Sequence, residues 1–274
     1  MEQVIVVQVS LEIGKVEIIP NEYGKIHTPS YINITDNEIL FGKTAKNQLP
    51  YNLNNTFYKM KTLFGKKYFN NKINDLRKYL TFDLKEGPKN ILFGENGKYS
   101  SEEIFYQIFK KLKENAEKYL EKEINNVVIS IPILFFYHQR RGMKRIAAKA
   151  GFNDIRLIPV TTAAAFAFGF DKTFNDEKTI LTFDLGGGFL DIAILKIEEG
   201  LYETISVIGD DAAGGQYFDL RLVEYCAGEF RRKTNKDINS NKKSMLRLLK
   251  SCENAKKIFS CQNQENIELI IYLK

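Results

Sequence analysis

The sequence has few of the residues that form disulfides and zinc sites. Its 274 residues include three cysteines and two histidines, and the cysteines are Cys226, Cys252 and Cys261. An odd number of cysteines without a CxxC spacing argues against a disulfide framework, and two histidines contribute little to a Cys/His zinc site. We therefore expect reduced thiols that are buried or incidental.

Long apolar segments are also absent. No stretch reaches the roughly 18 apolar residues that cross a bilayer, and the N-terminus lacks the basic head, apolar core and cleavage site of a signal peptide. We predict a cytoplasmic protein with no membrane partner. Because 44% of the residues are hydrophobic and 27% are charged, the composition is that of a globular chain with one large domain or two lobes.

The net charge of +6 raises the question of nucleic acid. The cations in 140–149 recur at helical spacing beside apolar residues, which is typical of the solvated face of an amphipathic helix. Those in 231–243 are mixed with Asn, Asp and Ser, without the aromatic residues that stack on bases. We predict no nucleic-acid partner.

The first half of the chain has the pattern of an α/β protein. Alternating apolar residues predict short strands at 4–9, 15–19, 30–34 and 38–41. Ser100 and Glu103 form a capping-box pattern that predicts a helix ending near Glu121. A strand, a helix and a strand are then predicted at 126–131, 137–150 and 155–158. This order is typical of a sheet with crossover helices.

The second half predicts a separate sheet. A helix at 162–170 and a polar connector at 171–178 precede three strands joined by Gly-rich turns, at 179–183, 189–197 and 202–207. Two helices and a last strand follow, at 217–232, 243–259 and 267–273. We expect the apolar edge of that last strand to favour dimerisation or aggregation.

A glycine motif, Asp184-Leu185-Gly186-Gly187-Gly188, lies between two of these strands. Glycine allows positive φ and close approach of NH groups to phosphate, and a carboxylate at a strand end can hold Mg²⁺ through water. A strand follows the motif, which argues against a P-loop or Rossmann turn, because both lead into a helix. A phosphate clamp of the actin-like ATPases and an ordinary hairpin turn both fit.

A second pair, Gly214-Gly215, precedes a predicted helix. Backbone NH groups at such a point can bind an anion, although glycine is also common at helix starts.

Five runs, in order and with similar gaps, resemble the ATPase domain of the Hsp70 family. They are GKVEII at 14–19, TPSY at 28–31, AKNQ at 45–48, TAAA at 162–165 with FG at 168–169, and FDLGGG at 183–188. The resemblance extends from about residue 4 to the last residue. It implies an α/β actin-like ATPase fold, with 1–175 as the first lobe, 31–103 as its peripheral subdomain, and 176–274 as part of a second lobe. It leaves no substrate-binding domain in this chain.

The resemblance also implies a site for ATP or ADP with Mg²⁺. Lys61 resembles the lysine that orients the attacking water, Asp184 the carboxylate that meets Mg²⁺ through water, and Asp191 a second acidic partner. Without the resemblance, Lys61 fits an ordinary surface lysine. Asp184 and Asp191 then fit acidic residues at a turn or at the edge of a strand. The implied phosphate and adenosine residues are Gly186, Gly187, Gly188, Gly214, Gly215, Glu253, Lys256, Lys257 and Ser260.

The adenosine helix has one substitution. Lys257 stands where the family has arginine, and lysine stacks poorly on a purine. Without the resemblance, the residues from 252 to 260 predict only a helix in which Glu253 forms ion pairs with Lys256 and Lys257. The implied partners are a J-domain co-chaperone and a nucleotide exchange factor.

Several departures fall where the family carries out its chemistry. Val160 and Thr161 replace a catalytic glutamate and the next proline, and Phe189 replaces a threonine that meets phosphate. Valine can neither orient water nor accept a proton. The first phosphate loop of the family has no counterpart at residues 1–4. The Gly-rich loop that comes later in the family's sequence has no counterpart in this sequence either. Pro132 and Arg140 match a pair that relays nucleotide state.

We therefore predict an Hsp70-like ATP-binding chaperone module for protein folding, cut short at both ends, with weak ATP binding and little hydrolysis. A non-hydrolysing interaction module and an incomplete gene product are alternatives. An actin-like sugar or acetate kinase fits less well, because TPSY and AKNQ resemble the chaperones and not the kinases.

Overall fold

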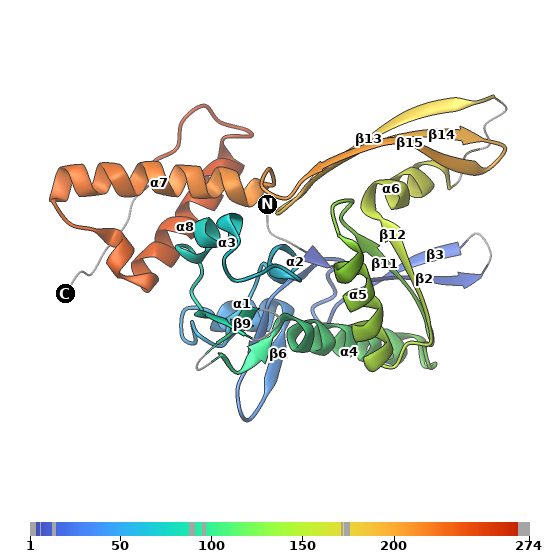
Figure 1. Cartoon of the computed structure of the whole chain (residues 1–274), viewed down its shortest axis with the longest axis horizontal. Coiled ribbons are helices and arrows are strands. Elements are labelled where there is room, and N and C mark those ends of the chain that lie inside the picture. The colour runs from blue at the N-terminus through green and yellow to red at the C-terminus, as the bar shows by residue number, and fades with distance from the viewer. Residues whose placement is uncertain are drawn as a thin grey trace.

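The structure is a computed structural model that describes residues 4–5, 7–12, 15–87, 91–94, 97–170, 172 and 176–267. Short sheets alternate with helices along the chain, and a long pair of helices lies at the opposite end of the molecule from the largest sheet (Figure 1). Within these residues, no helix combines the length and the apolar character needed to cross a membrane.

The N-terminal strands pair as antiparallel ladders. They are β1 (Val4–Ile5) with β4 (Thr28–Pro29), and β2 (Val7–Glu12) with β3 (Lys15–Ile19). A three-stranded sheet follows, in the order β6 (Ile39–Phe41), β5 (Ile32–Ile34) and β7 (Thr56–Phe57). Helix α1 (Gly42–Gln48) packs beside it. The strands predicted from alternation are confirmed.

The next segment contains short elements whose bounds the sequence pattern did not predict. They are α2 (Met60–Leu63), α3 (Asn71–Arg77), β8 (Leu84–Glu86), β9 (Ile91–Phe93) and β10 (Tyr99–Ser100), with the strands antiparallel in the order β10-β9-β8. Aromatic rings fill the core here, because Phe82 packs edge to face on Phe57 at 5.3 Å and on Phe93 at 5.9 Å. Such pairs contribute beyond their buried area.

Helix α4 (Ser101–Leu120) begins at the predicted capping box. The Glu103 NH donates to Ser100 Oγ at 3.2 Å, and the Ser100 NH donates to Glu103 Oε2 at 2.7 Å. These bonds satisfy donors that the first turn would otherwise leave free. The helix ends at Glu121, which adopts a left-handed φ of 53°.

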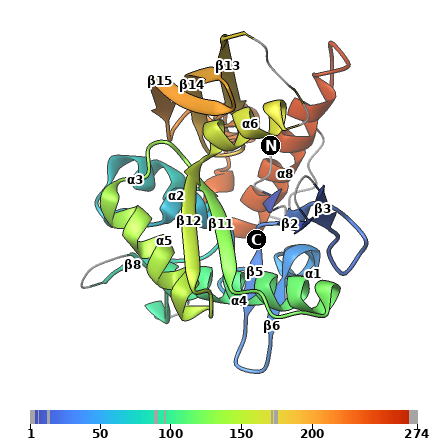
Figure 2. The ribbon, with the colours of Figure 1, turned by 90° about the vertical axis from the view of Figure 1, so that its right-hand side faces the viewer.

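The predicted strand–helix–strand unit is confirmed. Strands β11 (Asn126–Ile131) and β12 (Asp154–Pro159) are parallel, and α5 (Tyr137–Lys149) connects them (Figure 2). Helix α5 buries its apolar side at Met143, Ile146 and Ala147. Its basic residues Arg141, Lys144, Arg145 and Lys149 are exposed, which confirms the solvated basic face.

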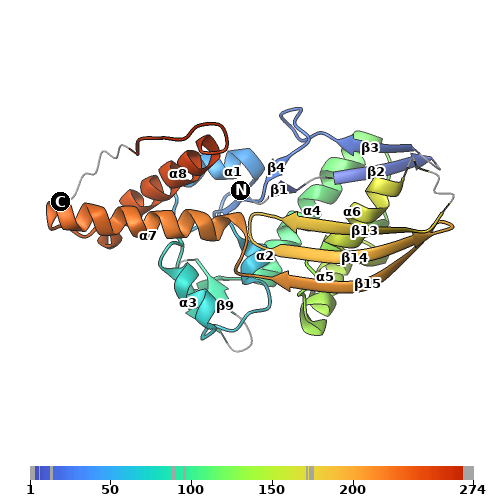
Figure 3. The ribbon, with the colours of Figure 1, turned by 90° about the horizontal axis from the view of Figure 1, so that it is seen from above.

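The second sheet is antiparallel in the order β13 (Lys178–Leu185), β14 (Leu190–Glu198) and β15 (Leu201–Asp210) (Figure 3). Helix α6 (Val160–Gly169) covers one face, where Ala165 packs with Ala193 and Leu195. The opposite face exposes large apolar side chains, which are Leu181, Phe183, Ile194 and Ile208.

Two long helices follow, α7 (Gly215–Thr234) and α8 (Lys242–Ile258), with the 3₁₀ turn η2 (Ile238–Ser240) between them. Their shared apolar cluster also takes in Leu76 and Tyr79, at and just after α3. The N-terminal and C-terminal parts of the chain are therefore packed together. Most of the predicted last strand, from residue 268, lies outside the described residues.

The three thiols are free, as expected. Cys252 is buried in the α7–α8 cluster, Cys226 is partly buried and Cys261 is exposed.

Candidate functional site

Two predicted site carboxylates face each other across neighbouring strands. Asp184 on β13 and Asp191 on β14 are direct partners in the antiparallel register. Asp191 is 2% exposed, and its Oδ1 accepts a hydrogen bond from the Ile133 NH at 2.9 Å. Burial raises the pKa of Asp191 and the Asp184 charge adds to this, while the Ile133 NH and Lys61 act in the opposite direction.

Lys61, on the short helix α2, belongs to the same cluster. Burial lowers the pKa of Lys61, and the charges of Asp184 and Asp191 oppose this. The structure thus brings together the three residues predicted as catalytic, one cation and two carboxylates. This group has the charge pattern of a phosphate site in which a metal ion sits between acids and ligand.

The glycine turn is bonded to the start of helix α7. The Gly215 NH donates to the Gly186 carbonyl at 2.9 Å, and the Gln216 NH donates to the Gly187 carbonyl at 2.8 Å. A Cβ at Gly214 would lie only 2.5 Å from the backbone of Gly188, so the two glycine segments touch through their main chains. Close approach is therefore what requires glycine at 214.

The glycine turn itself does not use the positive φ that glycine allows, because Gly186, Gly187 and Gly188 all lack it. The NH groups of Gly187 and Gly188 donate to no acceptor within the described part of the chain. Those of Gly215 and Gln216 are already bonded to carbonyls. Among the described residues, NH groups without an acceptor therefore remain at Gly187 and Gly188 in the first motif and at Gly214 in the second.

A cavity of about 490 Å³ lies between the segment that carries α1 and β7 and the helix α8. Its volume falls in the range of small-molecule sites. Three of the predicted binding residues line it, namely Gly187, Glu253 and Lys257. Tyr31 and Tyr58 form part of the opposite wall.

The predicted adenosine helix contributes charged side chains to this region. Lys257 Nζ pairs with Glu253 at 2.8 Å, as its spacing predicts. Lys256 pairs instead with Asp219 Oδ1 on α7 at 2.6 Å and donates to the Gly215 carbonyl at 3.0 Å. Lys256 therefore joins α8 to the second glycine pair.

Ser260 is less closely tied to this region. It follows the end of α8, is exposed and is not among the cavity-lining residues.

Three of the substituted positions, Val160, Thr161 and Phe189, are not among the residues that line the cavity, whereas the fourth, Lys257, is. Phe189 is 8% exposed, and its ring packs 6.2 Å from Phe135 in the main core. An apolar ring gains by this burial, so Phe189 extends the core where a hydroxyl was expected to meet phosphate. Val160 begins α6, and Thr161 is buried with an Oγ1 that finds no hydrogen-bond partner in the described residues.

Arg140 holds the loop that follows Pro132. Its Nε donates to the Phe135 carbonyl at 2.8 Å, and a terminal guanidinium NH donates to the Ile133 carbonyl at 3.3 Å. Because the Ile133 NH binds Asp191, this loop connects the acidic pair to α5. The motif comparison singled out Arg140, but only the structure identifies Ile133.

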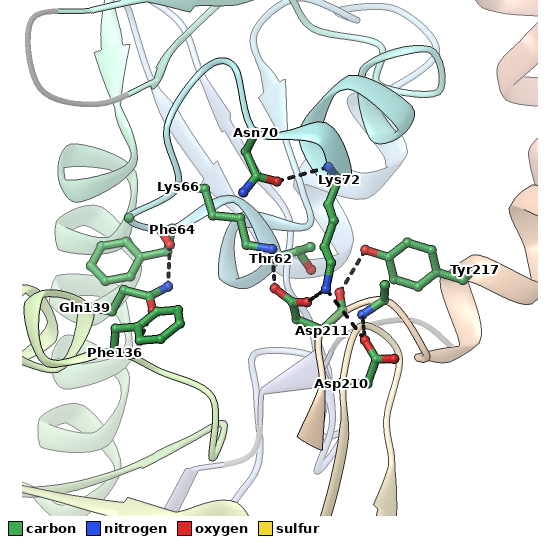
Figure 4. Close-up of polar contacts among 12 residues, drawn as sticks. Thr62, Phe64, Lys66, Asn70, Lys72, Phe136, Gln139, Asp210, Asp211 and Tyr217 are labelled. Carbon is green, nitrogen blue, oxygen red and sulfur yellow. Dashed lines mark hydrogen bonds and ion pairs between the residues drawn. The ribbon is translucent and has the colours of Figure 1, made fainter. Parts of the chain in front are cut away.

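An ion cluster beside the site joins the two halves of the chain (Figure 4). Asp211, between β15 and α7, pairs with Lys66 at 2.5 Å and also with Lys72. The Tyr217 hydroxyl donates to the Asp211 carbonyl at 2.9 Å. Burial acts to raise the pKa of Asp211, but the two lysines outweigh it and the net shift is downward. Sequence reasoning missed this cluster, because nothing local pairs Asp211 with residues about 140 positions away.

Comparison with known proteins gives concordant matches. The family model described as "Hsp70 protein" matches residues 4–273. Heat shock 70 kDa protein 2 of Paracoccidioides lutzii is 40% identical over 260 residues, which are 93% of this chain and 40% of that protein. A heat shock 70 kDa protein of Neurospora crassa is 40% identical over 258 residues, 92% of this chain and 40% of the relative. The human "Putative heat shock 70 kDa protein 7" is 38% identical over 261 residues, 93% of this chain and 71% of the relative.

Proposed function

Because the chain belongs to the Hsp70 family, we propose that it is an ATP-binding module of a chaperone that hydrolyses its nucleotide slowly or not at all. Family membership confirms the resemblance drawn from the motifs and the actin-like α/β fold predicted with it. It also removes the sugar-kinase alternative. The chain spans 40% of the length of the first two relatives, so clients and co-chaperones are part of the proposal.

One observation carries the nucleotide assignment. Gly187, Glu253 and Lys257, predicted separately from distant motifs, line one cavity of suitable volume. Gly187 brings a free NH to its wall, and α8 brings alternating charges. The proposed lobes, 1–175 and 176–274, supply opposite walls of this cavity, and ATP or ADP would lie between them.

The residues near the glycine turn suit Mg²⁺ held through water. Asp184 and Asp191 lie opposite each other, and their mutual repulsion contributes to the raised pKa of Asp191. A divalent cation would relieve that repulsion, and Mg²⁺ commonly takes one or two carboxylates while keeping several waters. Bound Mg²⁺ would neutralise charge on the phosphates. Lys61 would hold a second positive charge beside them.

Slow hydrolysis follows from the side chains at two positions. Val160 has no atom that can orient water or accept its proton. Phe189 is turned into the core and offers no hydroxyl to the phosphates. Phosphoryl transfer depends on a positioned nucleophile as well as on charge stabilisation. The site therefore favours binding over turnover.

Single-turnover hydrolysis of labelled ATP by the purified chain tests this proposal. We expect a rate near that of ATP in buffer, and an increase in Val160→Glu. Val128→Glu is the matched control, because Val128 is 63% exposed on β11 and the same charge there should change nothing. A wild-type rate equal to that of an intact Hsp70 would contradict the proposal.

A further inference from the structure

Lys59 lies immediately before α2 and lines the same cavity. The charged residues that line this cavity are four lysines and two acids, Lys46, Lys59, Lys250, Lys257, Asp219 and Glu253. The excess of lysine gives the cavity a positive potential. Clefts of one sign concentrate ligands of the opposite sign.

The charge of Lys59 has no carboxylate of its own. Asp219 is paired with Lys256 at 2.6 Å, and Glu253 is paired with Lys257 at 2.8 Å. Among the described residues, the ammonium group of Lys59 makes no hydrogen bond and no ion pair within 4.0 Å, and only its backbone carbonyl accepts hydrogen bonds, from Thr62 and Leu63. Burial lowers the pKa of Lys59 to about 8, although the charges of Asp219 and Glu253 act to raise it. A partly buried cation without a close partner is costly, so the fold alone does not account for it.

The backbone at this residue is also unusual. Lys59 has φ 60° and ψ 24°, in the left-handed region that side chains other than Gly, Asn and Asp rarely adopt. Unfavourable backbone geometry of this kind is concentrated at functional sites. One residue thus combines backbone strain with an unpaired charge at the wall of a cavity.

The cavity supplies a second group suited to an anion. Gly187 lines it, and the Gly187 NH has no acceptor in the described part of the protein. An ammonium group and a free backbone NH on one cavity are the donors that phosphate oxygens accept.

We propose that Lys59 is a ligand-contacting lysine whose ammonium group pairs with the phosphate chain of the nucleotide in this cavity. This inference rests on the proposed function. It separates two lysines that lie two residues apart, because Lys61 faces the carboxylates Asp184 and Asp191. Lys59 faces the cavity instead, where the ligand supplies the missing negative charge.

The pairing predicts a coupling between ATP binding and protonation. A bound phosphate stabilises the charged amine, so at pH 8.5 ATP should bind with uptake of protons by Lys59. Other charged or titratable groups face this region from every neighbouring element, namely Tyr31, Lys46, Tyr51, Tyr58, Asp219, Lys250, Glu253, Lys256 and Lys257. The Lys59 contribution is therefore the difference between wild type and a Lys59 variant.

Isothermal titration calorimetry with ATP at pH 8.5, in two buffers of different ionisation enthalpy, tests the proposal. Lys59→Met should lose the proton uptake and bind ATP about tenfold more weakly, while melting as a folded protein. Such a loss corresponds to about 1.4 kcal/mol. Lys59→Arg should keep most of the affinity without the uptake. Lys144→Met is the control, because this exposed lysine on α5 is not among the residues that line the cavity, and its loss should leave the affinity unchanged.

The outcomes separate the two proposals. Tight binding by wild type and Lys59→Met alike, with equal proton uptake, overturns the role of Lys59 and leaves the nucleotide site intact. Absence of ATP binding by the folded wild type overturns the nucleotide site, and the role of Lys59 with it.

Discussion

Replacing Asp211 by Asn should weaken the attachment between the two halves of the chain. The carboxylate of Asp211 accepts from Lys66 and Lys72, on the segment around α3, and it lies on the turn that leads into α7. Asparagine keeps the size of the side chain and removes its charge. Lys66 would then remain largely buried, at 11% exposure, without its anionic partner.

The expected loss is about 2 kcal/mol in the free energy of unfolding. Breaking a fully buried ion pair costs about 3–5 kcal/mol, whereas an exposed pair contributes about 0–1 kcal/mol. The Asp211 side chain is 19% exposed and that of Lys72 is 45% exposed, so the cluster lies between these limits.

The pH dependence has a definite sign. The pKa of Asp211 is lowered in the folded state, so its stabilisation is present above the unfolded pKa of about 3.9 and is lost as the pH falls through the folded value. The stability of Asp211→Asn should therefore change less than that of wild type over this acidic range.

Urea unfolding followed by circular dichroism measures both effects. Asp36→Asn is the control, because Asp36 pairs with Lys98 at 2.6 Å on the open surface and its loss should leave the midpoint unchanged. Equal midpoints for Asp211→Asn and wild type at pH 7 would refute the assignment of the cluster as an attachment between the two halves.

Two further substitutions test packing at the site. Thr161→Val removes a buried hydroxyl that has no partner among the described residues, and we expect thermal melts to show a gain of about 1 kcal/mol. A loss of stability would mean that the hydroxyl is bonded after all. Gly214→Ala places a methyl group against the Gly188 backbone and should cost about 1–3 kcal/mol and weaken ATP binding. Gly228→Ala, with open space around it in α7, should instead be neutral or stabilising, and equal effects of the two changes would argue against the contact.

Local signals in the sequence predicted much of the fold. The capping box at Ser100 placed the start of α4, and the strand–helix–strand rhythm placed β11, α5 and β12. These elements are determined by neighbouring residues, through capping and periodic burial. The very short strands β8 to β10 have too few residues to establish a period.

Contacts between distant segments could not be read from the pattern. The motif comparison named Lys61, Asp184 and Asp191 one by one, but their proximity depends on how α2 packs against the second sheet. Lys59 was not singled out, because a lysine in a polar stretch has no local feature that marks it as lining a cavity. Its position on the cavity became visible only with the tertiary structure.

The central claim is that this site binds ATP and does not turn it over. Equilibrium dialysis of labelled ATP against an excess of the purified chain with Mg²⁺, followed by chromatography of the bound label, measures both properties at once. The account predicts that the bound label is still ATP after a time in which an intact Hsp70 would have hydrolysed its ATP many times over. Recovery of ADP on the protein, or of no bound label, would contradict it.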